Sequence, residues 1–141
     1  MQMMEKIENM LGSKPITLDG GVTITRQPTT RQSNRVMIQF SNGRKRVVHY
    51  RCNGDMIRFW SVCVASHLAR NLNNGWLAEQ LLARNRVVDV VGFTLAPKGG
   101  IEAEFAQRAT TLQRDELLFY LILIAREADR FAEYVTQKDR E

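Results

Sequence analysis

The sequence predicts an α+β domain in which an antiparallel sheet is packed with helices on one face. Three patterns predict it: apolar residues at helical spacing near both ends of the chain, β-branched residues alternating with polar ones, and Asn-Gly pairs between the alternating segments. The expected order of elements is αβββαββα. With 141 residues, the chain has the length of one domain, residues 1–141, whose core needs no disulfide or metal.

The first elements are short. A helix is expected over residues 3–11, with Gly12 as its stop. Residues 22–25 are β-branched throughout and alternate between two faces, which predicts a strand. Residues 27–34 are polar or turn-forming, so we expect a flexible loop there, and residues 138–141 form a frayed tail.

Two hairpins are expected between residues 35 and 65. Asn42-Gly43 and Asn53-Gly54 each separate segments of alternating apolar residues, a pattern typical of two-residue turns. Residues 35–40, 45–52 and 55–65 would then form an antiparallel meander. One extra loop residue would exchange the faces of the following strand. Counted across two-residue turns, one face carries Val36, Ile38, Phe40, Val47 and Trp60, and the other carries Met37, Val48, Tyr50, Ile57 and Phe59.

The second half of the chain is expected to return to helix, then strand, then helix. Residues 76–85 have apolar side chains at helical spacing. Residues 90–96 and 101–106 alternate as strands do, and the Pro-Lys-Gly-Gly segment between them predicts a turn. A long helix follows over residues 115–135, with acidic residues suited to its first turn.

This last helix has apolar residues on more than one side. One stripe predicts the core contact: Leu117, Leu121, Ile124, Ala128, Phe131 and Val135. Phe119 and Leu123 project roughly opposite, beside Arg126 and Arg130, where a surface helix normally carries polar side chains. Either the N-terminal helix packs over these two residues or a second copy of the chain does. We expect a homodimer in which Phe119 and Leu123 lie at the interface.

Positive charge is concentrated in the first half. The chain has a net charge of +5, but residues 12–75 hold ten Lys or Arg against two acidic residues, a net of +8. Such a region can attract acidic protein segments, nucleic acid or lipid headgroups. The charge alone does not choose among them.

The second face of the meander is the predicted binding surface. Its apolar residues are Met37, Val48, Tyr50, Ile57 and Phe59, and it is bordered by Arg35, Arg44 and Arg46, with Arg51 as a further candidate. Aromatic rings beside arginines can stack single-stranded bases, and the same surface can hold an extended peptide at a sheet edge. The third reading is that a helix of this chain simply covers the face.

Motifs that would indicate catalysis, a metal or a cofactor are missing from the sequence. Cys52 and Cys63 lack zinc or redox spacing and are expected to be reduced and structural. No acidic residue stands at a motif spacing from His49 or His67, and the glycine pairs at 20–21 and 99–100 read as turns. Five acidic residues on the last helix are expected to form a solvated face with neighbouring arginines: Asp115, Glu116, Glu127, Asp129 and Glu133.

Neither a signal peptide nor a membrane span is expected. The N-terminus has acidic residues early and no apolar run behind basic ones. The longest unbroken apolar run, residues 117–125, is far shorter than the roughly 20 residues of a spanning helix. We therefore expect a cytoplasmic protein.

Several segments resemble the YbjN family, whose fold is similar to that of type III secretion chaperones. The resemblance is clearest in LLARNRVVDV (81–90), GFTLAPKGGIEAEF (92–105) and the closing helix DELLFYLILIAREADRFAEYV (115–135), including Ala128, Asp129 and Phe131. It implies a protein that holds or regulates other proteins, often as a homodimer. Secretion chaperones tend to be acidic, whereas this chain is basic.

Together these observations predict a non-catalytic protein-binding module, a chaperone-like adaptor or regulator without cofactor or metal. Its partner is an unknown protein or peptide with acidic character. The alternative is a nucleic-acid-binding regulator that uses the arginine-rich sheet face.

Overall fold

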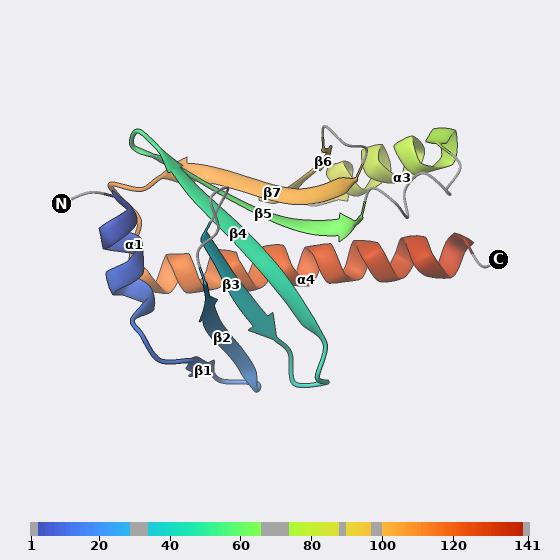
Figure 1. The fold of residues 1–141 in the computed structure, drawn as a ribbon. Helices are drawn as coiled ribbons and strands as arrows, with labels where there is room; N and C mark the ends of the chain where they lie inside the picture. Colours follow the sequence, from blue (N-terminus) through green and yellow to red (C-terminus); the bar gives the residue numbers. More distant parts are fainter. Residues whose placement is uncertain (1–2, 29–33, 66–73, 88–89, 97–99, 140–141) are drawn as a thin grey trace.

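A seven-stranded antiparallel sheet forms one layer of the protein (Figure 1). The structure is a computed structural model that describes residues 3–28, 34–65, 74–87, 90–96 and 100–139. The strands are β1 (Ile16–Leu18), β2 (Val22–Gln27), β3 (Asn34–Gln39), β4 (Lys45–Asn53), β5 (Met56–Val64), β6 (Gly92–Leu95) and β7 (Ile101–Arg108). Their order across the sheet is β1-β2-β3-β4-β5-β7-β6, so β1 and β6 are the edges.

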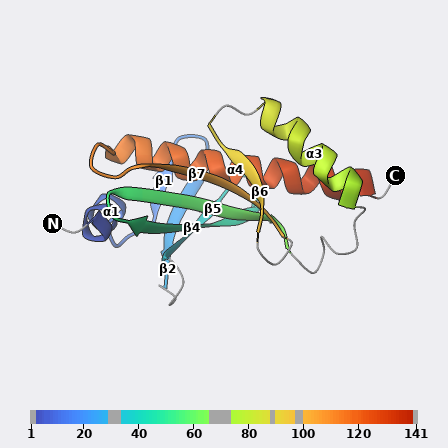
Figure 2. The same ribbon diagram turned by 90° about the horizontal axis from the view of Figure 1, so that it is seen from above.

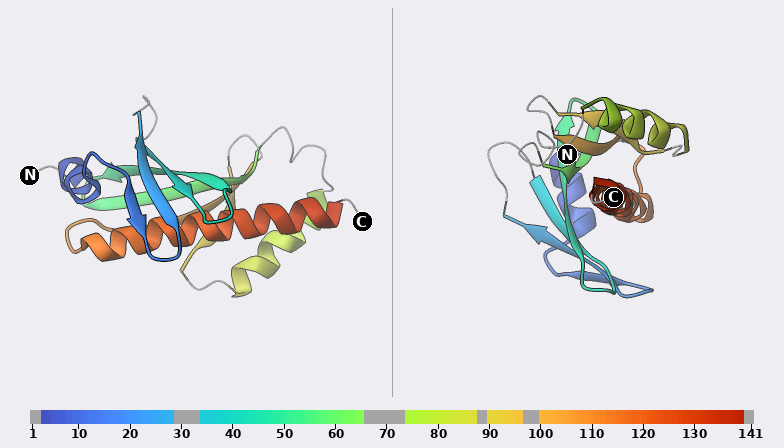
Figure 3. Two further views of the ribbon diagram at one scale, coloured as in Figure 1. Left: turned by 90° about the horizontal axis from the view of Figure 1, so that it is seen from below. Right: turned by 90° about the vertical axis from the view of Figure 1, so that its right-hand side faces the viewer.

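Three helices complete the fold: α1 (Met3–Leu11), α3 (Asn74–Val87) and α4 (Arg114–Asp139). The sheet curves around α4, and α3 lies on the same side of the sheet as α4 (Figures 2 and 3). The predicted α+β class, with helices on one face of an antiparallel sheet, is confirmed.

The strand count differs from the predicted order αβββαββα, which has three strands before the second helix where the structure has five. The residue patterns predicted four of them singly, and β1 was missed because it is only three residues long. The predicted loop 27–34 is also too wide at its ends, since Gln27 closes β2 and Asn34 opens β3. Residues 138 and 139 belong to α4 instead of a frayed tail. Residues 29–33 and 140–141 lie outside the described part of the chain.

The predicted apolar stripe of α4 forms the centre of the core. Leu117, Leu121, Ile124 and Ala128 are fully buried against the sheet, and Phe131 stacks on Phe93 of β6 with ring centroids 4.8 Å apart. Burying a large apolar side chain contributes about 1.5–3 kcal/mol. The buried stripe therefore holds α4 across the strands and determines which face of the sheet is covered.

Helix α1 packs at the start of α4. Its Ile7 and Leu11 are buried in the same core, and Lys6 Nζ donates hydrogen bonds to the carbonyl oxygens of Ala109 (2.8 Å) and Thr110 (3.0 Å). Arg114 Nε in turn donates to the carbonyl oxygen of Met10 at 3.0 Å. These contacts fix α1 to the turn that precedes α4.

The loop between β3 and β4 is one residue longer than predicted. Gln39 pairs with Lys45, Phe40 N donates to Arg44 O, and Gly43 N donates to Phe40 O, both at 2.9 Å. The loop is therefore Ser41 to Gly43, with Gly43 at φ 87°, a left-handed conformation that glycine adopts without strain. The extra residue exchanges the faces of β4 relative to β3, so the predicted sharing of faces is wrong.

The β4–β5 turn keeps the predicted parity. Asn53 pairs with Met56, so the two turn residues are Gly54 and Asp55, one position beyond the predicted pair. The side chains of β3, β4 and β5 therefore divide between the two sides of the sheet. The side facing α4 carries Val36, Ile38, Val48, Tyr50, Ile57 and Phe59, and the opposite side carries Met37, Val47, His49 and Trp60.

Candidate functional site

Four of the predicted binding residues lie in the core. Val48, Ile57 and Phe59 are fully buried and Tyr50 is 2% exposed, because α4 and α1 cover this side of the sheet. Burial raises the pKa of Tyr50 to about 12. The prediction that these residues share an accessible surface with Met37 is therefore wrong, and the reading in which a helix covers them is correct.

Two of the predicted arginines also point to the helix side. Arg44 Nη2 and Arg46 Nε each donate to Asp129 Oδ1 of α4, both at 2.9 Å. Burial tends to raise the pKa of Asp129, but the hydrogen bonds and positive charges of the two arginines outweigh it and hold this pKa below its ordinary value. Arg44 and Arg46 thus fasten β4 to α4, which removes them from a binding surface on the opposite side.

The other side of the sheet faces away from the helices that the structure describes. No helix in the described ranges packs on it: α3 and α4 lie on the core side (Figures 2 and 3), and α1 buries Ile7 and Leu11 in the same core. We call this surface the open face. Its central residues are Arg35, Met37, Val47, His49, Arg51, Arg58, Trp60, Val62, Glu102 and Glu104.

The centre of the open face is a pair of stacked rings. His49 of β4 and Trp60 of β5 are directly paired, with ring centroids 5.2 Å apart and planes 13° apart. Arg58 Cζ lies 4.5 Å from the Trp60 ring centroid, within the range of a cation–π contact. Arg58 also binds Glu102 at 3.3 Å and Glu104 at 2.5 Å. Contacts within the chain therefore hold these rings and charges in place.

The surroundings of His49 favour its neutral form, because they lower its pKa. Its partial burial lowers its pKa below 6.5, and the positive charge of Arg35 on the adjacent strand lowers it further. Arg35 itself is half-buried and donates through Nη2 to the carbonyl oxygen of Pro28 at 3.3 Å. Among the residues that the structure describes, its buried Nε has no hydrogen-bond partner.

The open face includes a hollow beside Trp60, which is larger than a second hollow on the helix side of the sheet. This larger hollow, about 540 Å³, is lined by Arg51, Asn53, Met56, Arg58 and Trp60. The smaller, about 250 Å³, lies at the opposite side of the sheet by Asp129 and does not belong to the open face. Met56 and Val62 on the open face are 39% and 40% exposed, so apolar surface stays in contact with water there.

The edge strand β6 is already capped. Asn85 of α3 donates through Nδ2 to Phe93 O (3.0 Å) and accepts from Phe93 N through Oδ1 (2.7 Å). A side chain that pairs with both backbone groups of an edge residue blocks the addition of another strand there. The opposite edge strand, β1, has only three residues. The face of the sheet is thus better suited to a partner than its edges.

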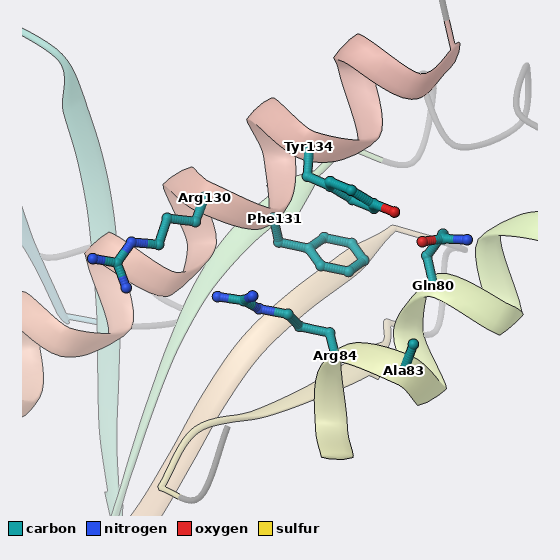
Figure 4. Close-up of a pocket in the computed structure, with 6 residues that line it drawn as sticks. All are labelled: Gln80, Ala83, Arg84, Arg130, Phe131 and Tyr134. Atoms are coloured by element: carbon teal, nitrogen blue, oxygen red, sulfur yellow. The ribbon is translucent and has the colours of Figure 1, made fainter. Parts of the chain in front are cut away.

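A second concave site lies between α3 and α4 (Figure 4). It has a volume of about 210 Å³ and is lined by Gln80, Ala83, Arg84, Arg130, Phe131 and Tyr134. Both of its arginines bind Glu127, Arg84 at 2.5 Å and Arg130 at 3.0 Å. Glu127 is only 5% exposed, so its charge needs these partners. Arg84 therefore links α3 to α4, whereas Arg130 pairs with Glu127 within α4 and keeps an exposed side chain.

Two of the five acidic residues of α4, Glu127 and Asp129, differ from the solvated face that was predicted, whereas Asp115 and Glu133 are exposed as expected. Glu127 is buried and Asp129 is mostly covered, and both bind arginines of other elements: α3 for Glu127, β4 for Asp129. The intrahelical pairing was predicted correctly only for Arg130 with Glu127. The sequence signal that marks these residues is their position at the border of the apolar stripe.

The two predicted interface residues on α4 have different environments. Phe119 is 58% exposed and meets Tyr120 edge to face, while Leu123 is half-buried against the core. Helix α1 does not cover Phe119, because its contacts hold it against the turn before α4.

No group of three or more His, Cys, Asp or Glu residues in the described part of the chain could hold a metal ion. Cys52 and Cys63 are free thiols, and burial raises the pKa of Cys63 to about 12, which makes it a poor nucleophile. His67 lies outside the described residues.

Comparison with known proteins adds no assignment: no family model matches the sequence, and no curated protein is similar to it. Within the described residues, no helix combines the length and apolar character needed to cross a membrane.

Proposed function

We propose that this chain is a non-catalytic binding module that holds a partner protein on the open face of its sheet. The observation that carries the proposal is the half-buried, stacked pair His49 and Trp60, set among arginines on a face that no described helix covers. Aromatic and arginine side chains are the residues most enriched in interface cores.

The partner that fits is an extended segment in which acidic and apolar residues alternate. The open face presents Arg35, Arg51, Arg58 and, at its margin, Lys45, against Glu102 and Glu104, a positive balance. Met37, Val47 and Val62 supply apolar contacts between these charges. Acidic groups would be steered to the arginines, and burial of apolar side chains would supply most of the affinity.

Nucleic acid is the second candidate, since exposed rings beside arginines can stack bases. Two observations make it weaker than protein binding. Arg44 and Arg46, which were predicted to border the binding surface, bind Asp129 instead, so fewer cations remain for phosphate groups. Glu102 and Glu104 lie on the open face and would repel phosphate groups.

We further propose that the protein acts in the cytoplasm as a homodimer, in the role of a chaperone-like adaptor or regulator. The exposure of Phe119 supports self-association. The adaptor role is supported by the resemblance of several sequence segments to YbjN proteins, whose fold is similar to that of secretion chaperones.

Tryptophan fluorescence tests the binding site directly. The chain has two tryptophans, so Trp76→Phe leaves Trp60 as the only reporter. We would titrate this protein with strand-length peptides of alternating acidic and apolar residues, and separately with single-stranded oligonucleotides. Saturable binding of peptides supports the proposal. Preferential, salt-sensitive binding of oligonucleotides supports the second candidate instead.

Two matched controls make the result specific. Arg35→Glu changes a charge on the open face, whereas Lys14→Glu makes the same change at an exposed residue outside it. If both variants lose affinity equally, the effect is that of net charge and the open face is not the site.

A further inference from the structure

The side of α4 opposite its buried stripe carries apolar residues between charges of opposite sign, and its two arginines also line the hollow beside Val22 and Phe40. We call this side the outer face of α4 and define it by Asp115, Phe119, Ile122, Leu123, Arg126 and Arg130. Asp115, Arg126 and Arg130 are exposed, Phe119 is 58% exposed, and Ile122 and Leu123 are half-buried. Asp115 and Arg126 make no ion pair with any residue of the described ranges.

The spacing of these residues is symmetric about the bond between Ile122 and Leu123. Asp115 lies seven residues before Ile122, and Arg130 lies seven residues after Leu123. Phe119 lies three before Ile122, and Arg126 lies three after Leu123. A second α4 laid antiparallel across the first, with a two-fold axis at this point, therefore brings unlike charges opposite one another.

We propose that two copies of this chain dimerise through the outer faces of α4, packed antiparallel. In this arrangement Asp115 meets Arg130 of the partner subunit, and Phe119 packs against Arg126 of the partner subunit in a cation–π contact. Ile122 and Leu123 of both copies meet at the centre and lose their remaining contact with water. Each contact occurs twice because of the two-fold axis.

A second copy suits this surface better than a segment of the same chain. Helix α1, the nearest candidate, is held at the turn before α4 by Lys6 and Arg114. Two copies of this face place Asp115 opposite Arg130 only when the helices run antiparallel. In a parallel pair, each charged residue would lie opposite the same residue of the other copy. Arg130 can serve both partners, since its side chain is 63% exposed while it binds Glu127.

This geometry rests on the proposed homodimer but not on the proposed use of the open face. The outer face of α4 and the open face lie on opposite sides of the sheet (Figure 3). A dimer of this kind leaves both open faces uncovered and directed outward. Two such faces could engage two segments of one partner, which raises the overall affinity through effective concentration.

Charge exchange between two variants tests the proposal. Asp115→Arg places two arginines opposite one another in a homodimer, and Arg130→Glu places two acidic residues there. A mixture of the two variants restores both unlike pairs in a heterodimer. We would measure mass by multi-angle light scattering for each variant alone and for the mixture at about 100 µM, a concentration at which a dimer of micromolar Kd is formed. Glu79→Arg, an exposed charge change on α3, is the control.

The expected result is a dimer for the unchanged chain and for Glu79→Arg, monomers for each charge variant alone, and a dimer for the mixture. Circular dichroism confirms that each variant is folded. An unchanged chain that is monomeric at this concentration overturns the homodimer itself. Variants that stay dimeric alone, or a mixture that stays monomeric, overturn the antiparallel geometry while leaving the binding role of the open face untouched.

Discussion

Trp60 lies against His49 on the neighbouring strand, with ring centroids 5.2 Å apart and planes only 13° apart. The next residue before Trp60, Phe59, points to the other side of the sheet and is fully buried. One peptide bond therefore separates a core ring from a ring on the open face. This alternation allows the core and the proposed binding surface to be tested with neighbouring substitutions.

Phe59→Ala should destabilise the protein far more than Trp60→Ala. Phe59 packs between Tyr50 and Phe105 in the core, so its removal leaves a cavity and costs about 3–5 kcal/mol. Trp60 is partly exposed, so its removal should cost clearly less. Urea unfolding followed by circular dichroism measures both free energies. Equal losses would mean that the open face is covered in solution.

Asp129→Asn should lower the free energy of unfolding by about 1–3 kcal/mol, since it weakens charge-assisted hydrogen bonds at a mostly covered site. Its folded pKa lies below the ordinary value of 3.8, so this contribution is present above pH 4 and is lost as the pH falls through the lowered pKa. Glu133→Gln is the control, because the Glu133 side chain is 51% exposed and its Oε1 lies 3.6 Å from Arg44 Nη1. The prediction fails if the two variants unfold at the same urea concentration.

Arg84→Met should destabilise the protein by about 3–5 kcal/mol, because it leaves the buried Glu127 with only the more exposed Arg130. Replacing the whole cluster by apolar residues, in Arg84→Met with Glu127→Leu, should recover most of that loss. Hydrogen exchange of α3 amides in both variants reports whether the helix stays on α4. A double variant no more stable than Arg84→Met would show that the charge of Glu127 is not the cause.

Stability should fall on mild acidification because of His49. Its folded pKa is lowered below 6.5, so the unfolded chain takes up the proton first. The free energy of unfolding should therefore be constant above about pH 7 and decrease from pH 6.5 through the lowered pKa. His49→Asn should flatten this slope between pH 6.5 and 5, where carboxylates contribute little. An unchanged slope in that variant would assign the effect to another group.

The sequence was sufficient to predict the class of the fold, because the fold class depends on the periodic spacing of apolar residues. The α4 stripe, the hairpins around residues 42 and 54, and the turn at residues 20 and 21 all follow from local rules that the structure confirms. These rules act within a few residues and do not depend on distant contacts.

The binding surface was not predictable in the same way, because it depends on the parity of a single loop. Gly43 fits a two-residue turn and a three-residue loop equally well, and the structure contains the latter. That one residue moved Val48, Tyr50, Ile57 and Phe59 from the predicted surface into the core, and left His49 and Trp60 outside. The burial of Glu127 was hidden for another reason, since its partner Arg84 lies 43 residues away in the sequence.

The most direct test of the account is the affinity of a labelled acidic-apolar peptide for the unchanged chain and for Trp60→Ala, measured by fluorescence anisotropy. We predict that Trp60→Ala weakens binding by about 2 kcal/mol, roughly thirtyfold, as expected for an aromatic residue at the centre of an interface. Tyr134→Ala, which removes an exposed ring from α4, should leave the affinity unchanged. Equal affinity of Trp60→Ala and the unchanged chain would contradict the claim that the open face binds a partner.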